Sequence, residues 1–206
     1  MAKRKRDAGQ INKRTLSAIR NLMKDLDQKY SIKVGIIGNN AYEQHPHTDL
    51  TNAQLGAIHE FGAVINVTPK MRAYLHHNGI HLKKDTTQVV IPARSFLRDT
   101  LLSKGGKEEL LERVMLTNER DFNKALVEVR QADNPDIEVF KTLCEQIGLE
   151  ALVMVQDAFA VGGRPDKWKP ISEVTRQNRK NDKSSPPLTD SGDLRNSITM
   201  QVKKVK

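Results

Sequence analysis

The sequence predicts an α+β fold, in which a small, mostly antiparallel sheet of three to five strands is packed by helices. Two observations predict this class. Apolar and polar residues alternate in short segments near both ends of the 206-residue chain, at 31–38 and 198–202. Between them, residues 107–161 show the spacing of three and four that is typical of helices. Because the strands neither alternate strictly with long helices nor follow sandwich spacing, α+β is the class that fits.

We expect a disordered basic arm at residues 1–11 and a single α+β domain over residues 12–206. A chain of this length can bury a good core, although only 37% of its residues are hydrophobic. Inside the domain we expect an inserted helical hairpin at 107–161 and a long polar loop at 164–188. The loop is rich in proline and charge, a composition that is poorly able to make a core.

The sequence of the first part of the domain predicts a helix, a strand, a loop, a second helix and a second strand. Their expected ranges are 15–30, 31–38, 39–50, 51–61 and 63–68. Thr51 is a suitable N-cap for the second helix, and Gly62 is suited to end it. Pro69 stops the second strand, since proline has no N–H for a strand ladder.

Residues 70–88 allow two interpretations. Asn78–Gly79 is a two-residue turn signal that predicts a β-hairpin. The flanking residues equally fit one helical turn followed by a strand. We favour the hairpin and keep the helix as the alternative.

The stretch VVIPARSFLRDTLLSK organises the chain, because it predicts a strand, a corner and a helix in succession. The β-branched run Val89–Ile91 suits a buried strand, and Pro92 stops it. Ser95 is suited to cap the helix that follows. Arg94 and Arg98 are four residues apart and are expected to share one flank of that helix.

Two long helices and a closing strand are predicted in the second half. Gly105–Gly106 should end the preceding helix, after which residues 107–131 and 135–161 form an antiparallel helical hairpin. Cys144, the single cysteine, lies in the apolar stripe of the second of these helices, where a small buried hydrophobe is expected. Trp168, in the polar loop, is expected to anchor that loop to the protein's own body.

The chain is basic, with a formal net charge of +9 and a pI near 9.7. Part of this charge lies at the N-terminus, where a weak electrostatic contact with DNA is conceivable on charge alone. Its residues are Lys3, Arg4, Lys5 and Arg6. No apolar run approaches the roughly 20 residues that cross a bilayer, and no apolar segment of a secretory signal follows the first residues, so we expect no membrane partner.

No catalytic residue, metal ligand or cofactor is expected. The motifs G-x-S-x-G, G-x-x-x-x-G-K-[ST] and G-x-G-x-x-G are absent. The histidines lie in three clusters without an H-E-x-x-H pattern, and we interpret them as surface or hydrogen-bonded residues. They are His45 and His47, then His59, then His76, His77 and His81. A metal-dependent hydrolase remains an alternative, as does a basic nucleic-acid-binding module.

Three phrases carry a family resemblance. They are LGAIHEFG at 55–62, IPARSFLRDTL at 91–101 and LTDSGDLRNSI at 188–198, the last preceded by the W-x-P of Trp168 and Pro170. In this order and spacing, and together with INVTPKMR at 65–72, they resemble the tailed-phage virion morphogenesis and tail-completion proteins. The resemblance covers most of the chain from about residue 30 onward.

The resemblance implies a non-enzymatic structural protein at the head–tail junction of the virion, made in the host cytoplasm. It implies a homo-oligomeric ring, six-fold, that joins the portal and connector proteins to the tail tube or tail terminator protein. The motif positions carried over are His59, Glu60, Phe61, Gly62, Pro92, Arg94, Phe96, Arg98, Thr189, Gly192, Leu194 and Ser197.

These positions are expected to act as scaffold. Phe61, Phe96 and Leu194 should pack, the two glycines should make turns, and the two arginines should form salt bridges or subunit contacts. We further expect the polar segments 1–11, 39–50 and 164–188 to be mobile and to order on their partners.

Overall fold

A computed structural model of the chain describes residues 30–46, 48–117, 127, 137–179 and 183–205. These residues form an α+β fold, as predicted. Their strands belong to two separate antiparallel ladders of two strands each, and no larger sheet is present in the described part of the chain. The strands are β1 (Tyr30–Gly35) with β4 (Thr199–Lys204), and β2 (Ala63–Asn66) with β3 (Gln88–Ile91).

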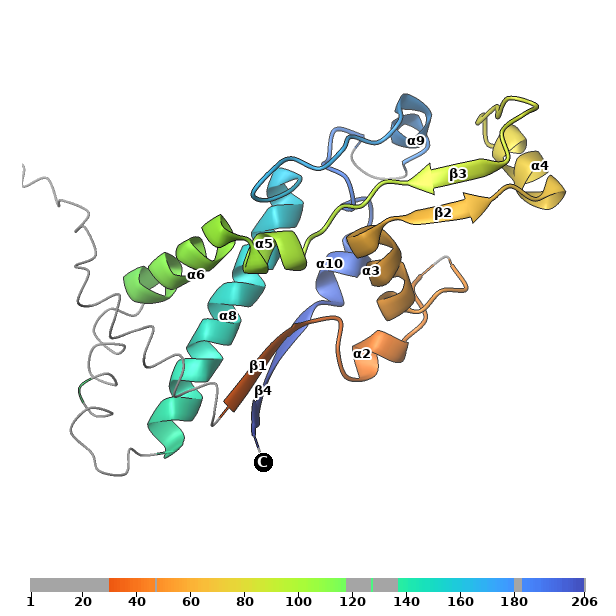
Figure 1. Cartoon of the computed structure of the whole chain (residues 1–206). Helices are drawn as coiled ribbons and strands as arrows, with labels where there is room; N and C mark the ends of the chain where they lie inside the picture. The colour runs from red at the N-terminus through yellow and green to blue at the C-terminus, as the bar shows by residue number, and fades with distance from the viewer. Residues whose placement is uncertain (1–29, 47, 118–126, 128–136, 180–182, 206) are drawn as a thin grey trace, which may run out of the picture.

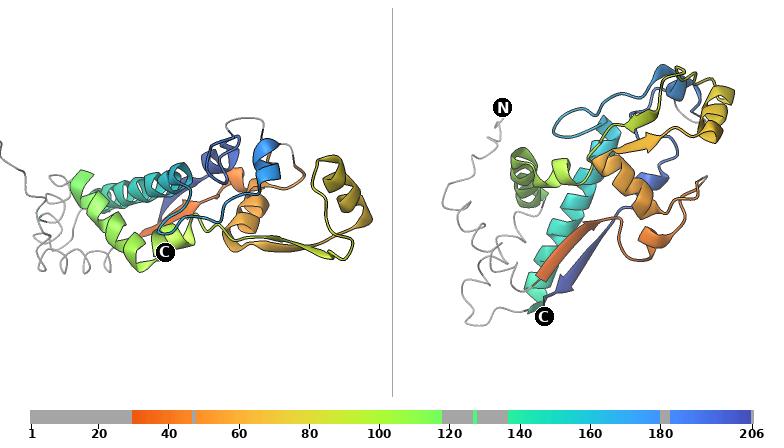
Figure 2. Two further views of the ribbon diagram at one scale, coloured as in Figure 1. Left: turned by 90° about the horizontal axis from the view of Figure 1, so that it is seen from above. Right: turned by 45° about the vertical axis from the view of Figure 1, so that its right-hand side comes forward.

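The helices differ greatly in length, and the longest lies at the centre. They are α2 (Asn39–Tyr42), α3 (Asn52–Phe61), α4 (Pro69–His77), α5 (Arg98–Leu102), α6 (Lys104–Thr117), α8 (Ile137–Val161), α9 (Glu173–Gln177) and α10 (Asp193–Asn196). In Figure 1, α8 lies beside α6 and the β1–β4 ladder, whereas the β2–β3 ladder and α4 project to one side. The two views of Figure 2 show the same projection.

The β1–β4 ladder packs one face on α8. Ile32 lies opposite Val202, and Val34 lies opposite Met200, so these apolar side chains share a face. Gly148 of α8 allows the close approach, because a Cβ at this position would lie 3.1 Å from the sulfur of Met200. The closing strand predicted by alternation is therefore confirmed.

Two apolar clusters follow the length of α8. The first consists of Tyr30, Val114, Leu143, Cys144 and Ile147. The second consists of Phe96, Val155, Phe159, Leu194 and Ile198. The Cys144 side chain is fully buried as predicted, and burial followed by the charge of Glu145 raises the pKa of its thiol to about 11.

The helices α6 and α8 pack against each other in opposite directions. Glu109 forms an ion pair with Arg164, which follows α8, and Arg113 lies 2.8 Å from Asp157. Val114, farther toward the C-terminus of α6, packs in the cluster with Leu143, which lies toward the N-terminus of α8. The described parts of the predicted hairpin are thus antiparallel, and its turn lies outside the described residues.

The hairpin predicted around Asn78–Gly79 is wrong, and the alternative helix is correct. The hydroxyl of Thr68 accepts a hydrogen bond from the N–H of Met71 at 3.1 Å, and Pro69 occupies the first turn of α4. A threonine cap followed by proline is a helix start, and this local signal outweighs the Asn-Gly turn. The following loop is held to α4 by the Arg72 guanidinium, which donates to the carbonyl oxygens of residues 82, 83 and 86.

The stretch after α4 also differs from its prediction. Val90 is 67% exposed, so β3 is not a buried strand. The helix α5 begins only at Arg98, which leaves Arg94 outside it, and the two arginines do not share a helix flank. The glycines at 105 and 106 lie inside α6, because the break between α5 and α6 falls at Ser103, whose backbone is extended.

Several other predictions meet the structure only in part. The segments 39–50 and 164–188 contain the short helices α2 and α9 and are not all loop. The expected helix at 15–30, apart from its last residue, lies outside the described residues, as does the basic N-terminal arm. No helix in the described ranges is long and apolar enough to cross a bilayer.

Candidate functional site

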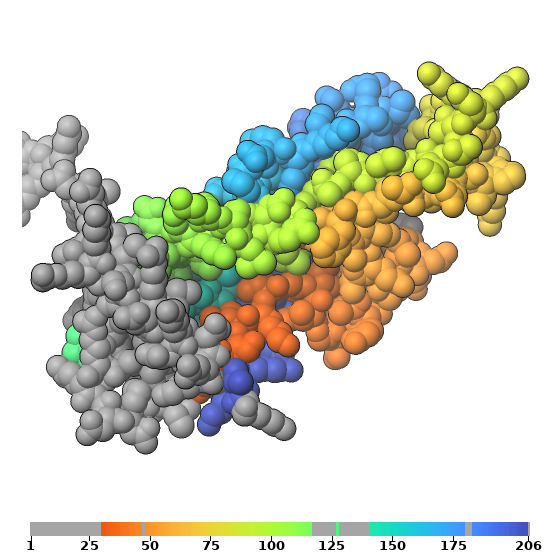
Figure 3. All heavy atoms as spheres, in the orientation of Figure 1, coloured from red at the N-terminus to blue at the C-terminus, as the bar shows by residue number. Residues whose placement is uncertain are grey.

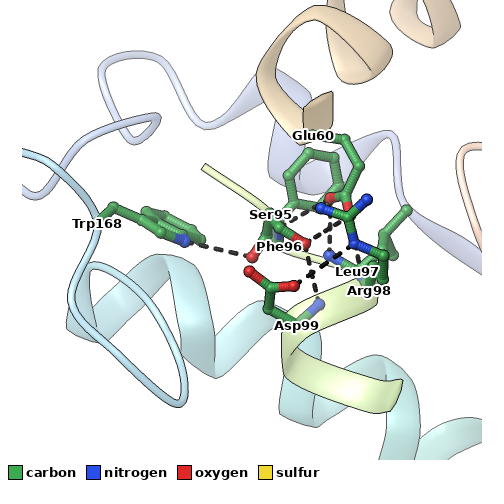
Figure 4. Close-up of polar contacts among 7 residues, drawn as sticks. All are labelled: Glu60, Ser95, Phe96, Leu97, Arg98, Asp99 and Trp168. Atoms are coloured by element: carbon green, nitrogen blue, oxygen red, sulfur yellow. Dashed lines mark hydrogen bonds and ion pairs between the residues drawn. The ribbon is translucent and has the colours of Figure 1, made fainter. Parts of the chain in front are cut away.

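A buried carboxylate joins two of the three family-like phrases. Glu60, in the last turn of α3, is only 5% exposed. It accepts hydrogen bonds from the backbone N–H groups of Phe96, Leu97 and Arg98 at 2.9, 3.0 and 3.0 Å (Figure 4). It also accepts one from the hydroxyl of Ser95 at 2.6 Å. One side chain therefore satisfies the N–H groups at the start of α5, which have no partner within their own helix.

The local sequence places Glu60 at this point. Thr51 and Gln54 form a capping box that starts α3, as the threonine predicted. Gly62 ends the helix with a φ of 76°, a conformation that favours glycine. A Cβ at Gly62 would lie 2.9 Å from both the Ile91 oxygen and the Ala93 nitrogen, so glycine also lets the two segments touch.

The segment around Trp168 is fastened to the same corner. The indole N–H of Trp168 donates to the backbone oxygen of Ser95 at 3.3 Å (Figure 4). Its ring meets Phe159 edge to face, with centroids 5.5 Å apart. Arg94, 7% exposed, donates to the backbone oxygen of Lys169 at 3.0 Å. The prediction that the tryptophan anchors its own loop is confirmed.

A second arginine holds the far end of this segment. Arg179 is 9% exposed and donates to the backbone oxygen of Ser185 at 2.6 Å and to that of Pro186 at 2.9 Å. Burial, followed by the charge of Arg179, lowers the pKa of Arg94. Neither arginine has a carboxylate partner among its hydrogen bonds in the described chain, so both act by binding carbonyl groups. Sequence reasoning missed Arg179 entirely.

The third phrase completes the corner. Leu194, on α10, is 5% exposed and packs in the cluster that contains Phe96, with Trp168 against it. Gly192 precedes α10 with a φ of 83°, as expected of a turn glycine. The hydroxyl of Ser197 donates to the Leu194 oxygen at 2.7 Å, and that of Thr189 donates to the Pro186 oxygen at 2.6 Å. We call the junction of Glu60, residues 94–98, Trp168 and Leu194 the corner.

The motif residue Phe61 does not have its expected role, whereas Arg98 forms an ion pair as expected. Phe61 was expected to pack, but it is 65% exposed, because α3 turns its preceding residue, Glu60, inward. The guanidinium carbon of Arg98 lies 5.3 Å from the centre of the Phe61 ring, and Arg98 also pairs with Asp99 at 3.5 Å. All of these groups lie on the surface beside the corner.

His59 lies on the edge of the corner, with its backbone oxygen bound by the N–H of Arg94 at 2.7 Å. Its Nδ1 is buried and has no hydrogen-bond partner. Burial, followed by the positive charges of Arg94 and His45, lowers the pKa of His59 to about 4. The ring is therefore neutral at physiological pH.

The polar groups of the corner are occupied in holding the fold. The hydroxyl of Ser95 donates to Glu60 and accepts from the N–H of Asp99 at 2.9 Å, and the serine is buried, so its hydroxyl links the end of α3 to the start of α5. Within the described ranges, no three His, Cys, Asp or Glu side chains gather as metal ligands.

The remaining histidines are distributed as follows. Nδ1 of His45 lies 2.7 Å from Oδ1 of Asn52, and this pair holds the 43–52 loop. His76, in the last turn of α4, has its Nδ1 2.7 Å from that of His81.

Comparison with known proteins gives no relative. No family model, no curated protein and no solved structure matches this chain. Its function is therefore inferred from its own residues and contacts together with the family resemblance of the three phrases.

Proposed function

We propose that this chain is a non-enzymatic structural protein of a tailed bacteriophage that forms a ring at the head–tail junction. In this role it joins the portal and connector proteins to the tail tube. The proposal places the protein in the neck of the virion and makes other copies of the chain its first partners.

One observation carries the proposal. Of the phrases that resemble tail-completion proteins, the first two are separated by 28 residues and the last two by 86, yet all three meet at the corner. Glu60 of the first phrase binds residues 95–98 of the second, the Trp168 indole binds Ser95, and Leu194 of the third packs with Phe96. Three phrases that together build one junction indicate the family more specifically than any one of them does alone.

A second observation supports a role in assembly. The described chain exposes apolar side chains on its projecting ladder, including Val64 at 61% and Val90 at 67%. Exposed apolar surface of this kind is typical of protein interfaces.

The proposal is tested in the phage that encodes the chain, by interrupting its gene. We expect filled heads and finished tails to accumulate separately, and purified protein added to such a lysate to join them. Electron microscopy counts the joined particles. A normal yield of joined particles without the protein would overturn the proposal, whereas restored joining by the added wild-type chain supports it.

A further inference from the structure

The β2–β3 ladder and the residues between its strands form a projecting element, which we call the arm (residues 63–91). In Figures 1 and 2 the arm extends away from α8 and the β1–β4 ladder. Figure 3 shows it as the narrow end of the molecule. Its base is fixed by the corner, and its tip is α4 with the loop that Arg72 holds.

One face of the arm's ladder carries an uncovered apolar pair. Val64 and Val90 are Cα partners in the ladder, so their side chains lie side by side on the same face. They are 61% and 67% exposed. The next pair on this face, Asn66 and Gln88, is joined by an amide hydrogen bond of 3.0 Å. A two-stranded ladder with an uncovered apolar face is marginally stable in water, so it gains from being covered.

The tip of the arm is basic. Between the two strands, residues 67–87 contain four Lys and Arg residues and a single carboxylate, Asp85. Lys70, Lys83 and Lys84 are exposed, and Arg72 is occupied with carbonyl groups. A surface that covers the arm should therefore present apolar side chains beside carboxylates.

The chain carries such a surface on α8, which we call the α8 stripe. Leu149 and Val153 are one helical turn apart and are 52% and 44% exposed. Glu145 lies one turn before Leu149, with 46% of its side chain exposed, and forms an exposed ion pair of 4.0 Å with Lys141. Glu150 lies beside Leu149 in the sequence. The stripe thus combines two exposed apolar side chains with two carboxylates, which matches the arm in polarity and in charge.

We infer that the arm of one copy docks on the α8 stripe of a second copy, and this inference rests on the proposed function. The two surfaces are different, so the contact is head to tail and can repeat around a closed ring. The arm supplies Val64 and Val90 to Leu149 and Val153, and its lysines face Glu145 and Glu150.

The first experiment uses the full chain in sedimentation velocity over a range of concentrations. We expect Val90→Asp and Leu149→Asp each to weaken self-association by about tenfold or more, since each puts a charge into the apolar centre of the contact. Leu116→Asp is the matched control, because Leu116 is 72% exposed on α6 and lies in neither surface. Circular dichroism and urea unfolding verify that each variant is folded, which is expected because all three side chains are exposed.

Mixing the two defective variants tests the head-to-tail geometry. The Val90→Asp copy keeps its stripe and the Leu149→Asp copy keeps its arm, so an equimolar mixture should form a pair that neither forms alone. A second mixture uses reversed charges. One copy carries K83E and K84E, and the other carries E145K and E150K. Each double variant should associate weakly by itself, and the two should pair when mixed. Failure of both mixtures to pair would overturn the inference.

Two other outcomes also decide against it. Unchanged association of both aspartate variants shows that the ring uses other surfaces, and it leaves the proposed function standing, because the joining of heads to tails is measured separately. Loss of duplex DNA binding in K83E with K84E, without any change in sedimentation, shows that the arm contacts nucleic acid instead.

Discussion

At the scale of single residues, the corner depends on one buried carboxylate. The first N–H groups of a helix need acceptors, and Ser95 supplies only one oxygen to them, through the N–H of Asp99. Glu60 accepts from the N–H groups of residues 96, 97 and 98 and from the Ser95 hydroxyl, although it belongs to another helix, 35 to 38 residues earlier in the chain. A glutamate thus links the end of α3 to the start of α5 through four hydrogen bonds.

Replacing this carboxylate with an amide should destabilise the fold. In Glu60→Gln one acceptor oxygen becomes an NH2 group that faces N–H donors, so hydrogen bonds are lost and donors remain buried. We expect a loss of roughly 2–4 kcal/mol in the free energy of unfolding, measured by urea denaturation. Glu112→Gln, an exposed change on α6, should alter it by less than about 0.5 kcal/mol. Equal stability of the two variants would contradict the role given to Glu60.

His59 predicts how stability depends on pH. Its pKa is about 4 in the folded chain against 6.5 ordinarily, so between these values the unfolded chain binds a proton that the folded chain refuses. Stability is therefore fully present above pH 6.5 and falls as the pH is lowered toward 4. The shift corresponds to at most about 3 kcal/mol, and solvent access to the ring reduces this.

Replacing the histidine isolates this contribution. His59→Gln cannot titrate, so its free energy of unfolding should fall less than that of the wild type between pH 7 and pH 4.5. Urea denaturation at the two pH values gives both slopes, and His77→Gln, on the exposed end of α4, serves as the control. Parallel slopes for the wild type and His59→Gln would show that other groups cause the acid sensitivity.

At the scale of elements, the sequence predicted features that depend on neighbouring residues. It did not predict features that depend on contacts between residues far apart in the chain. Thr51, Gly62 and the alternation before Lys203 predicted their helix start, turn and strand, because each signal acts within a few residues. The exposure of β3 could not be predicted, since the same β-branched residues suit a buried strand and an uncovered ladder. The hydrogen bonds from Glu60 to the start of α5 could not be predicted either, because no residue near α5 indicates that a side chain of α3 accepts from its N–H groups.

One miss had a usable signal. Thr68 followed by Pro69 is a helix start, and it should have outweighed the Asn-Gly pair nine residues later. The same lesson changes the interpretation of residues 164–188. They were expected to be mobile and to contribute little to a core, but Trp168 packs against Phe159, so deleting the segment should unfold the corner.

A single substitution tests how this segment is held. Trp168→Ala removes the ring contact with Phe159 and the hydrogen bond to Ser95, and we expect it to cost roughly 2–4 kcal/mol of stability. Limited proteolysis should then cut within 164–188 faster than in the wild type. Lys169→Ala, which removes only an exposed side chain, should leave both measurements unchanged. Unaltered proteolysis of Trp168→Ala would mean that Arg94 and Arg179 suffice to hold the segment.

At the scale of the whole molecule, the β1–β4 ladder and the arm differ in how much of the described chain packs against them. The β1–β4 ladder has α8 against one face, and both core clusters lie along that helix. The arm has its own two strands, the α4 tip, the corner at its base and one hydrogen bond from the α9 segment, in which the Asn178 amide donates to the Asn78 backbone oxygen at 3.0 Å. Local stability follows buried contacts, so the arm should open more readily than the rest of the fold.

Hydrogen exchange measures this difference and links it to assembly. In the separate subunit, the backbone N–H groups of β2 and β3 should exchange faster than those of β1 and β4, because a lone two-stranded ladder is marginally stable. In the ring, a neighbour covers the arm, so exchange in β2 and β3 should slow while β1 and β4 change little. Val90→Asp is the control, since it should keep the fast exchange of the separate subunit at every protein concentration. Slow exchange of the arm in the separate subunit would show that the ladder needs no cover, and the physical reason for placing it in an interface would be lost.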